Sequence, residues 1–232
     1  MICKGGRGMG EVRMEMTADG SHTLYVPEMD EHYHSVNGAI QESRHVFIEA
    51  GLHQVRKEKV RVLEIGFGTG LNALLTLADT ENGRGREVDY FAVERYPLSL
   101  KVVRTLNYGA LACPGREELF LALHTAAWDE AVALSGRFML RKMLGDSLTI
   151  PLPDGIDLVY FDAFAPDKQP EMWSLPVFHT LYRLMADEGV LTTYCAKGSV
   201  RRMMKEAGYS VERIPGPPGK REMLRATKKR SG

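Results

Sequence analysis

Short runs of β-branched and aromatic residues alternate with longer amphipathic segments along most of this chain. The short runs predict strands at residues 61–65, 88–93, 138–144, 157–161 and 190–194. The segments between them predict helices at residues 71–77, 97–106, 177–185 and 199–207, and an Ala- and Leu-rich stretch predicts helix over 108–134 with a break at Pro114-Gly115. Such alternation favours a mostly parallel sheet with helices on both faces.

The amino-terminal part of the chain has a different pattern. Residues 11–26 predict two strands around a turn at residues 18–21, which is a hairpin signal. Residues 37–51 have the periodicity of an amphipathic helix. We expect residues 1–55 to form a small appendage of hairpin and helix that packs on the main domain, residues 56–232.

The carboxyl-terminal part ends the alternation with two further strands. They are predicted at residues 209–214 and 222–226, on either side of the loop 215–219, which is too rich in proline for regular structure. Strands joined by so short a loop pair antiparallel. Together with the five strands above, they give an expected α/β fold with a mostly parallel, seven-stranded sheet.

The composition is that of one globular domain. The chain has 232 residues, of which 44% are hydrophobic and 26% charged, enough for a single buried core. The 30 basic and 30 acidic residues give a formal net charge of +0, so no overall field favours nucleic acid or an acidic membrane. Any contact with RNA is therefore expected to be local.

Cysteine and histidine positions indicate neither a disulfide framework nor a metal site. Cys3, Cys113 and Cys195 form no C-x-x-C pair, and His32 and His34 have no third ligand at a suitable spacing. The first ten residues have no apolar core of signal-peptide length, and no segment approaches the ~20 apolar residues of a membrane helix. We expect a cytoplasmic protein with no metal and no membrane partner.

A glycine-rich turn follows the first strand of the main domain. Gly66, Gly68 and Gly70 lie between this strand and a predicted helix, where glycine lets the backbone approach a ligand closely. Glu94 closes the next strand, and a carboxylate there can accept both hydroxyl protons of a ribose. A nucleotide-like cofactor is the usual occupant of such a turn, although glycines at turns also occur for backbone reasons alone.

The spacing of these glycines favours one cofactor class over another. Leu71 and Asn72 stand where a dinucleotide motif has its final glycine, and the acidic Glu64 precedes the first glycine. This combination resembles motif I of methyltransferases that use S-adenosylmethionine (SAM) more than it resembles an NAD fingerprint. The glycine turn therefore predicts a SAM site.

Acidic residues also end the later strands. Gly145-Asp146 follows the third strand, where methyltransferases of this type have an acidic residue near the adenine amino group, and Asp162 ends the fourth. For Asp146 a solvated turn or a helix cap is an equally good interpretation. We expect cofactor contacts from the glycine turn and these strand ends: Glu64, Gly66, Phe67, Gly68, Thr69, Gly70, Asn72, Glu94, Gly145, Asp146 and Asp162.

One longer motif identifies a family. Residues 160–166 read Tyr-Phe-Asp-Ala-Phe-Ala-Pro, residues 169–173 read Gln-Pro-Glu-Met-Trp, and together they resemble the methyltransferase half of MnmC, the bifunctional tRNA wobble-uridine modification enzymes. The same family is echoed at His34-Ser35, Gly38-Ala39 and Glu42, at residues 94–98, and at residues 220–224. These anchors span most of the chain.

The resemblance implies a Rossmann-like class I methyltransferase with a defined acceptor. SAM would methylate the aminomethyl nitrogen of 5-aminomethyl-2-thiouridine at the tRNA wobble position, and the substrate would be the tRNA anticodon loop. Because an amine must be unprotonated and in line with the methyl group, Asp162 is the candidate catalytic residue, as a base or as a group that orients the amine. Expected substrate contacts are His34, Ser35, Glu42, Phe164, Trp173, Lys220 and Arg221.

Aromatic and basic residues extend this expectation. Phe164, Tyr160 and Trp173 are candidates to stack on an extruded base, with a core position as the alternative for Tyr160. Basic residues gather late in the chain and are either phosphate contacts or a solvated tail: Lys197, Arg201, Arg202, Lys205, Lys220, Arg221, Arg225, Lys228, Lys229 and Arg230.

The sequence departs from the family in two ways. MnmC also carries an FAD-dependent oxidase half, for which 232 residues leave no room, so a stand-alone methyltransferase is expected, with a separate oxidase or another pathway supplying its substrate. The loop 215–219 is more proline-rich than the family's usual turn. Alternative functions are methylation of another RNA position or a small amine, an NAD-dependent oxidoreductase, and a non-catalytic RNA-binding protein.

Overall fold

The computed structural model describes residues 2–4, 10–83 and 86–230, with side chains described from residue 10 onward. Most of the first ten residues, including the side chain of Cys3, therefore lies outside this description. Cys113 and Cys195 are both buried and free. Among the described residues, no helix has the length and apolar character needed to cross a membrane.

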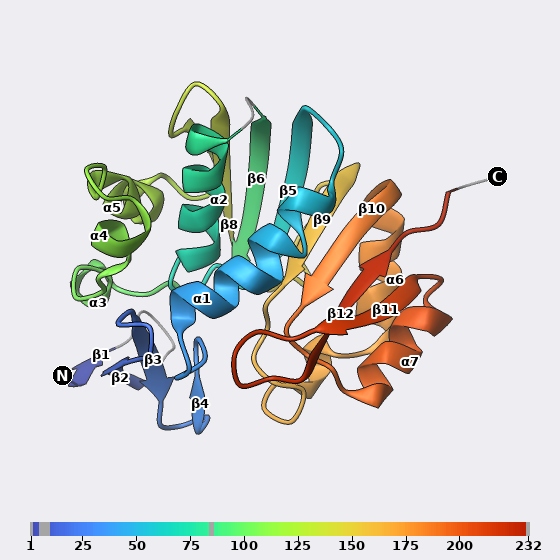
Figure 1. Cartoon of the computed structure of the whole chain (residues 1–232), viewed down its shortest axis with the longest axis horizontal. Helices are drawn as coiled ribbons and strands as arrows, with labels where there is room; N and C mark the ends of the chain where they lie inside the picture. The colour runs from blue at the N-terminus through green and yellow to red at the C-terminus, as the bar shows by residue number, and fades with distance from the viewer. Residues whose placement is uncertain (1, 5–9, 84–85, 231–232) are drawn as a thin grey trace.

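A sheet of eight strands forms the centre of the molecule (Figure 1). Five parallel strands make up its middle: β5 (Lys59–Ile65), β6 (Glu87–Glu94), β8 (Phe138–Leu144), β9 (Ile156–Phe161) and β10 (Met185–Thr193). At one edge, β12 (Glu222–Thr227) pairs antiparallel with β10 and with β11 (Ser210–Pro215). The strand order is β11-β12-β10-β9-β5-β6-β8-β7, which confirms the predicted α/β fold and its antiparallel edge.

The eighth strand corrects the expected count of seven. It is β7 (Ala131–Ala133), which pairs antiparallel with β8 at the other edge of the sheet. The prediction of helix as far as residue 134 was therefore wrong beyond Thr125, the last residue of α5. The helix ends there because Ala126 turns extended and Asp129 has a left-handed φ of 64°, which no continuing helix allows.

Helices cover both faces of the sheet, as the alternation predicted. One face packs against α1 (Ala39–Ser43), α2 (Leu71–Asn82), α4 (Tyr108–Ala112) and α5 (Glu118–Thr125). The other packs against α6 (Leu175–Leu184) and α7 (Gly198–Glu206), whose buried residues share a second cluster with β9 and β12. Successive residues of β5 belong to opposite clusters, since Val62 faces α2 and Leu63 faces α6.

Two helix predictions need smaller corrections. The helix expected at 97–106 is the single turn α3 (Leu100–Val103). It begins only at Leu100 because Ser99 has an extended backbone and its hydroxyl accepts from the Val102 amide as an N-cap. The helix expected at 37–51 is present, but α1 continues as the π-helical turn η1 (Arg44–Glu49). Short 3₁₀ turns follow at η2 (Leu52–Gln54) and later at η3 (Pro170–Met172).

The amino-terminal segment forms a second sheet of four strands: β1 (Ile2–Lys4), β2 (Glu11–Met16), β3 (His22–Val26) and β4 (Glu31–His32). The predicted hairpin is β2 and β3, whose turn is closed by Asp19 accepting from the Ser21 amide at 3.0 Å. Val12 and Leu24 belong to the same core cluster as α2. The Tyr108 hydroxyl, on α4, also donates to the His22 carbonyl at 2.5 Å, so the small sheet is packed and hydrogen-bonded onto the helices that cover one face of the large sheet.

Candidate functional site

A cavity of about 380 Å³ lies where β5, β6, β8 and β9 end. The segment 31–36, which includes β4, borders it on one side, and Lys220 from the β11–β12 loop borders it on another. In Figure 1 β4 and this loop lie near each other at the end of the sheet to which the β10 arrow points. The cavity therefore occupies the edge at which ligands bind in open parallel sheets.

The glycine turn forms the floor of this cavity. Its backbone has a conformation that glycine adopts readily and other residues rarely adopt. Gly66, Gly68 and Gly70 all have left-handed φ angles, of 92°, 50° and 73°. The amides of Gly66 and Phe67 both donate to the Val93 carbonyl, at 3.1 and 3.0 Å. A Cβ on Gly66 would lie 3.0 Å from the Asp162 carbonyl oxygen. The turn thus joins the ends of β6 and β9 and leaves its open side to the cavity.

Glu94, at the end of β6, is held in place by backbone donors. Its Oε2 accepts from the Gly68 amide at 2.8 Å and its Oε1 from the Tyr96 amide at 2.7 Å. Burial raises the pKa of Glu94, while these hydrogen bonds favour the carboxylate. Each carboxylate oxygen has a further lone pair, so Glu94 can also accept from ligand hydroxyls.

Asp162 follows β9 and has a different environment. The Asn72 side-chain amide donates to Asp162 Oδ2 at 2.8 Å. Burial raises the pKa of Asp162 to about 7, the Asn72 hydrogen bond lowers it, and Glu42 and Lys220 act in opposite directions. A carboxyl group with this pKa exchanges a proton near neutral pH, as a general base must.

Lys220, Glu42 and Tyr194 form a charged wall of the cavity. Lys220 Nζ donates to Glu42 Oε1 at 2.7 Å and lies 4.2 Å from the centre of the Tyr194 ring. Glu42 Oε2 accepts from the Ser35 amide at 2.8 Å, and the Tyr194 hydroxyl donates to the Ala163 carbonyl at 2.8 Å. This network joins α1, the end of β10 and the β11–β12 loop beside Asp162.

His34 and Asp146 complete the polar lining. His34 Nε2 lies 2.6 Å from Thr69 Oγ1, and burial lowers the pKa of His34 to about 4, so its ring is neutral. Asp146 accepts from Arg95 Nη1 at 2.9 Å and from the Leu148 amide at 2.9 Å. The turn before it requires Gly145, since a Cβ there would lie 2.6 Å from Ile150.

Most of the residues singled out from the sequence line this one cavity. They are His34, Ser35, Glu42, Gly66, Phe67, Gly68, Thr69, Asn72, Glu94, Gly145, Asp146, Asp162, Phe164 and Lys220. Four others do not line it: Glu64, Gly70, Trp173 and Arg221. The structure thus brings together segments that are up to about 190 residues apart, from His34 to Lys220.

The four residues outside the lining have other surroundings. Glu64 is fully buried, and burial raises its pKa well above its ordinary value. Gly70 faces His124 on the outer side of the turn. Trp173 is buried and donates from Nε1 to the Phe164 carbonyl at 2.7 Å, whereas Arg221 is exposed.

Tyr160, the third aromatic candidate, is a core residue. Its ring is fully buried between Phe47 and Tyr90, and its hydroxyl lies 3.2 Å from Thr76 Oγ1. The core alternative is therefore the correct one for Tyr160. Phe164 instead contacts Tyr33 edge to face with ring centres 5.2 Å apart, and both rings line the cavity.

Several lining residues were not among the site residues expected from the sequence: Tyr33, Arg95, Tyr96, Leu148, Met172 and Tyr194. Of these, Arg95, Tyr96 and Met172 lie within the family motifs at residues 94–98 and 169–173. Tyr194 directly follows β10, so the strand-end argument that found Asp162 would also have found it. Tyr33 had no such signal. It follows the two-residue strand β4 and reaches the cavity because its amide donates to the Leu24 carbonyl at 2.9 Å.

The lining fits SAM better than a dinucleotide. Carboxyl groups are frequent in it: Glu31, Glu42, Glu94, Asp146, Asp162 and Glu171. Its Lys and Arg residues, Lys220 and Arg95, are both paired with carboxylates. A sulfonium cation suits an acidic cavity of this kind, whereas a pyrophosphate would add negative charge beside these carboxyl groups. Glu94 and the glycine turn suit the ribose, and Ile65 and Leu148 offer apolar surface for a base.

Comparisons with known proteins agree with this geometry. Residues 123–229 match the sequence model of a family described as S-adenosyl-L-methionine-dependent methyltransferase. The chain is 37% identical over 209 residues to the tRNA 5-methylaminomethyl-2-thiouridine biosynthesis bifunctional protein MnmC of Pseudomonas paraeruginosa, over 84% of this chain and 32% of that protein. It is 34% identical to the MnmC of Magnetococcus marinus, over 94% of this chain and 34% of that protein. The chain thus spans about a third of the length of these curated relatives.

Solved structures give the same result. The crystal structure of MnmC2 from Aquifex aeolicus matches with a TM-score of 0.75 and 26% identity, over 95% of this chain and 71% of that one. Spermidine synthase from Thermotoga maritima, with a TM-score of 0.60 and 10% identity over 98% of this chain and 72% of that one, shares the fold. By its sequence relatives, its fold and its cavity, the chain belongs to the S-adenosyl-L-methionine-dependent methyltransferase family, together with the methyltransferase part of MnmC.

Proposed function

We propose that this methyltransferase transfers the methyl group of SAM to the aminomethyl nitrogen of 5-aminomethyl-2-thiouridine at the wobble position of tRNA. The observation that carries the proposal is Asp162, a carboxyl group with a pKa of about 7 on the same cavity as the glycine turn and Glu94. The names of the MnmC relatives point to the same nucleoside.

In this proposal the cofactor is held mainly by backbone and carboxylates. Glu94 accepts from the ribose hydroxyls, the glycine turn lies against the cofactor, and Gly145-Asp146 adjoins the adenine amino group. The bound sulfonium supplies an electrophilic methyl group. Thr69 and Asn72, at the amino end of α2, adjoin the part of the cavity near Asp162.

Asp162 is our candidate for the catalytic residue. The amine must be unprotonated when it attacks, and the nitrogen that gains the carbon loses one proton. Asp162 Oδ can accept a hydrogen bond from this amine, orient its lone pair and take up the proton. The Asn72 amide donates to Asp162 Oδ2 at 2.8 Å and helps to fix the carboxylate. Glu64 and Gly70 lie behind the cavity surface and would support the cofactor site without touching the cofactor.

The acceptor base would lie between the segment 31–36 and the loop after Asp162. Phe164 and Tyr33 are the aromatic rings there, and an extruded uridine can stack on either. We propose contacts to the nucleotide from His34, Ser35, Glu42 and Lys220. Trp173 supports the Phe164 carbonyl from within the core, and Arg221 is a candidate for a backbone phosphate because it is exposed.

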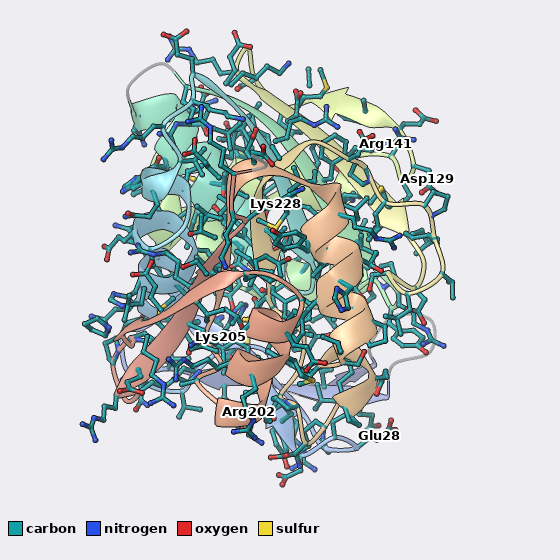
Figure 2. The ribbon with its side chains drawn as sticks, turned by 90° about the vertical axis from the view of Figure 1, so that its right-hand side faces the viewer. Glu28, Asp129, Arg141, Arg202, Lys205 and Lys228 are labelled. Carbon is teal, nitrogen blue, oxygen red and sulfur yellow. The ribbon has the colours of Figure 1, made fainter. Side chains whose placement is uncertain are left out.

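Basic side chains beyond the cavity are candidates for the rest of the tRNA. Arg202 and Lys205 extend from α7, and Figure 2 shows them on the same face of the molecule as Lys228. Lys197, at the start of α7, already pairs with Asp167 at 2.5 Å. Phosphate contacts at these positions would be local, on a chain with a formal net charge of +0, and they would be salt-sensitive.

The proposal extends to organisation and partners. Residues 1–55 are proposed as an appendage that packs on the methyltransferase domain, residues 56–232, with the segment 31–36 bordering the cavity. A separate FAD-dependent oxidase, or a pathway that makes the amine directly, supplies the substrate in the cytoplasm. The chemistry needs no metal, and among the described residues no group of three His, Cys, Asp or Glu side chains could hold one.

Methyl transfer from labelled SAM tests the proposal. The acceptors are tRNA carrying 5-aminomethyl-2-thiouridine, the same tRNA with the side chain absent, and small primary amines. We expect label only in the first, and Asp162→Asn should lower kcat by about 10²- to 10⁴-fold while SAM still binds. Label in the other tRNA or in the small amines would indicate a different acceptor, and near-normal turnover by Asp162→Asn would remove its catalytic role.

A further inference from the structure

A lysine occupies a core position in β8. Phe138, Leu140 and Lys142 alternate along this strand and face the same helical layer, and all three are fully buried. An apolar residue is expected at such a position, because burying an ammonium group removes its hydration. Burial accordingly lowers the pKa of Lys142 to about 8.

The surroundings of Lys142 are aromatic rather than acidic. Its Nζ lies 4.5 Å from the centre of the Trp128 ring and 5.5 Å from that of Phe67. No carboxylate of the described residues lies within ion-pair distance of it. Its hydrogen bond goes to the His124 carbonyl at 2.6 Å, in the last turn of α5, where carbonyls lack helical partners.

The side chain of His124, whose backbone carbonyl accepts from Lys142, contacts the glycine turn. Its ring Nε2 lies 3.0 Å from the Thr69 carbonyl, and since burial lowers the pKa of His124 to about 4, the neutral ring donates this hydrogen bond. The ring also packs against Phe67, with centres 5.1 Å apart. A Cβ on Gly70 would lie only 2.7 Å from Nε2, so the third glycine of the turn is required by His124.

Thr69 is therefore held from two sides. From outside the cavity, its carbonyl accepts from His124, and His124 is held by Lys142. From the cavity side, its hydroxyl lies 2.6 Å from His34 Nε2. Thr69 itself lines the cavity between Gly68 and Gly70, so the position of its backbone sets the shape of the proposed cofactor floor.

We propose that Lys142 is a positioning residue for the cofactor site, acting through His124 and Thr69 on the glycine turn. This inference rests on the proposed cofactor site and adds residues that do not touch it. A methionine would fill the same volume without the cost of burying a charge, so the hydrogen bond to the end of α5 is what the lysine supplies.

Binding of S-adenosylhomocysteine, the demethylated cofactor, to purified variants tests the proposal by calorimetry. Lys142→Met removes the donor, and His124→Phe keeps a packed ring but removes Nε2–H. Each should weaken binding by about tenfold, the cost of one buried hydrogen bond. His124→Gln, whose side-chain amide can replace Nε2, should bind within about twofold of the wild type.

Steady-state kinetics separate positioning from loss of stability. Lys142→Met should raise KM for SAM while kcat and KM for the acceptor stay within about twofold. The control is Leu181→Ala on α6, a buried residue of the other core cluster, which should lower the melting temperature without changing cofactor affinity. The double variant Lys142→Met/His124→Phe should bind no more weakly than His124→Phe alone, since both act on one path.

Three outcomes would overturn the inference. Wild-type affinity in Lys142→Met and His124→Phe would show that the path does not shape the site, and an equal loss in Leu181→Ala would show that any destabilisation has this effect. A wild-type chain that binds no S-adenosylhomocysteine would instead defeat the proposed function, and with it any cofactor site for Lys142 to position.

Discussion

Asp162 and Glu94 face one cavity but differ in their hydrogen-bond partners. Both Glu94 oxygens accept from backbone amides, at 2.8 and 2.7 Å, which favours a fixed carboxylate. Asp162 accepts from one side-chain amide, and burial raises its pKa to about 7. The first carboxylate suits binding, and the second suits proton transfer.

The pH dependence of catalysis should report on Asp162. The carboxylate is the active form, so kcat/KM for the acceptor should rise as pH increases through about 7. The Asn72 hydrogen bond stabilises this carboxylate, so Asn72→Leu should raise the Asp162 pKa and move the ascending limb to higher pH. Ionisation of the substrate amine is the same for both enzymes. If the ascending limb of the pH profile does not move in Asn72→Leu, it reports ionisation of the substrate amine instead of Asp162.

At the scale of elements, the glycine turn connects β5, α2 and the neighbouring strand ends. Its left-handed residues satisfy two different demands: Gly66 avoids the Asp162 carbonyl, and Gly70 avoids the His124 ring. Gly115 also has a left-handed φ, of 79°, but has open space around its Cβ position. Comparing substitutions at Gly70 and Gly115 therefore separates the effect of backbone strain from the effect of steric contact.

Gly70→Ala should disrupt the site more than Gly115→Ala. Both pay the cost of a left-handed alanine, about 1 kcal/mol, whereas only Gly70→Ala meets an atom, at 2.7 Å. We expect Gly70→Ala to lose cofactor affinity in addition to stability, and Gly115→Ala to lose only stability. Thermal melts and cofactor titrations of the two variants measure this, and equal affinities would contradict it.

The helices and strands were largely predictable, because the spacing of hydrophobic residues along each of them reflects the side that packs on the core. All seven strands expected in the main sheet are present, and the strand ends predicted from the sequence bring Glu94, Asp146 and Asp162 to one cavity. β7 was missed because its three residues, Ala131–Ala133, are too few to show an alternating hydrophobic pattern. Their extended conformation depends on pairing with β8. The start of the helix at 97–106 was predicted too early, because the Ser99 cap places its first residue at Leu100.

The rest of the site depends on contacts between distant segments. Tyr33 lies at the cavity through a backbone bond to Leu24, and Glu42 through a salt bridge to Lys220 across 178 positions. Lys142 would be interpreted as an exposed residue from its type alone, yet it is fully buried. Local pattern carries no information on such pairings, which is why the family motifs were needed to find Glu42 and Lys220.

For the whole molecule, the two sheets act as one unit around the cavity. Val12 and Leu24 from the small sheet share a core cluster with α2, and His34 after β4 contacts Thr69 in the glycine turn. The proposed boundary at residues 55 and 56 therefore separates segments by sequence rather than by core. Stability and site shape should be coupled across it.

Two histidines, the buried His34 and the half-buried His124, should make the folded state sensitive to acid. His34 and His124 have pKa values of about 4 against an ordinary value of 6.5, so the unfolded chain binds more protons between these values. Stability from neutral imidazole is complete above pH 6.5 and is lost as pH falls toward 4, by up to about 3 kcal/mol for each group. The raised pKa of Asp162 opposes this trend, so the comparison must be between matched variants.

Denaturant unfolding of the wild type and His34→Gln across this pH range isolates the histidine. Glutamine cannot be protonated there but keeps an amide near Thr69 Oγ1. The free energy of unfolding should fall less steeply with decreasing pH in His34→Gln than in the wild type. Parallel curves would show that His34 is protonated equally in the folded and unfolded chains.

The central claim is that this cavity brings SAM and the wobble aminomethyl group together at Asp162. Mass analysis of nucleosides tests it most directly, after incubation of SAM and tRNA carrying 5-aminomethyl-2-thiouridine with the wild type or with Asp162→Asn. The wild type should convert this nucleoside to its 5-methylaminomethyl form, and Asp162→Asn should leave nearly all of it unchanged. An unchanged nucleoside after incubation with a wild-type protein that binds SAM would contradict the account.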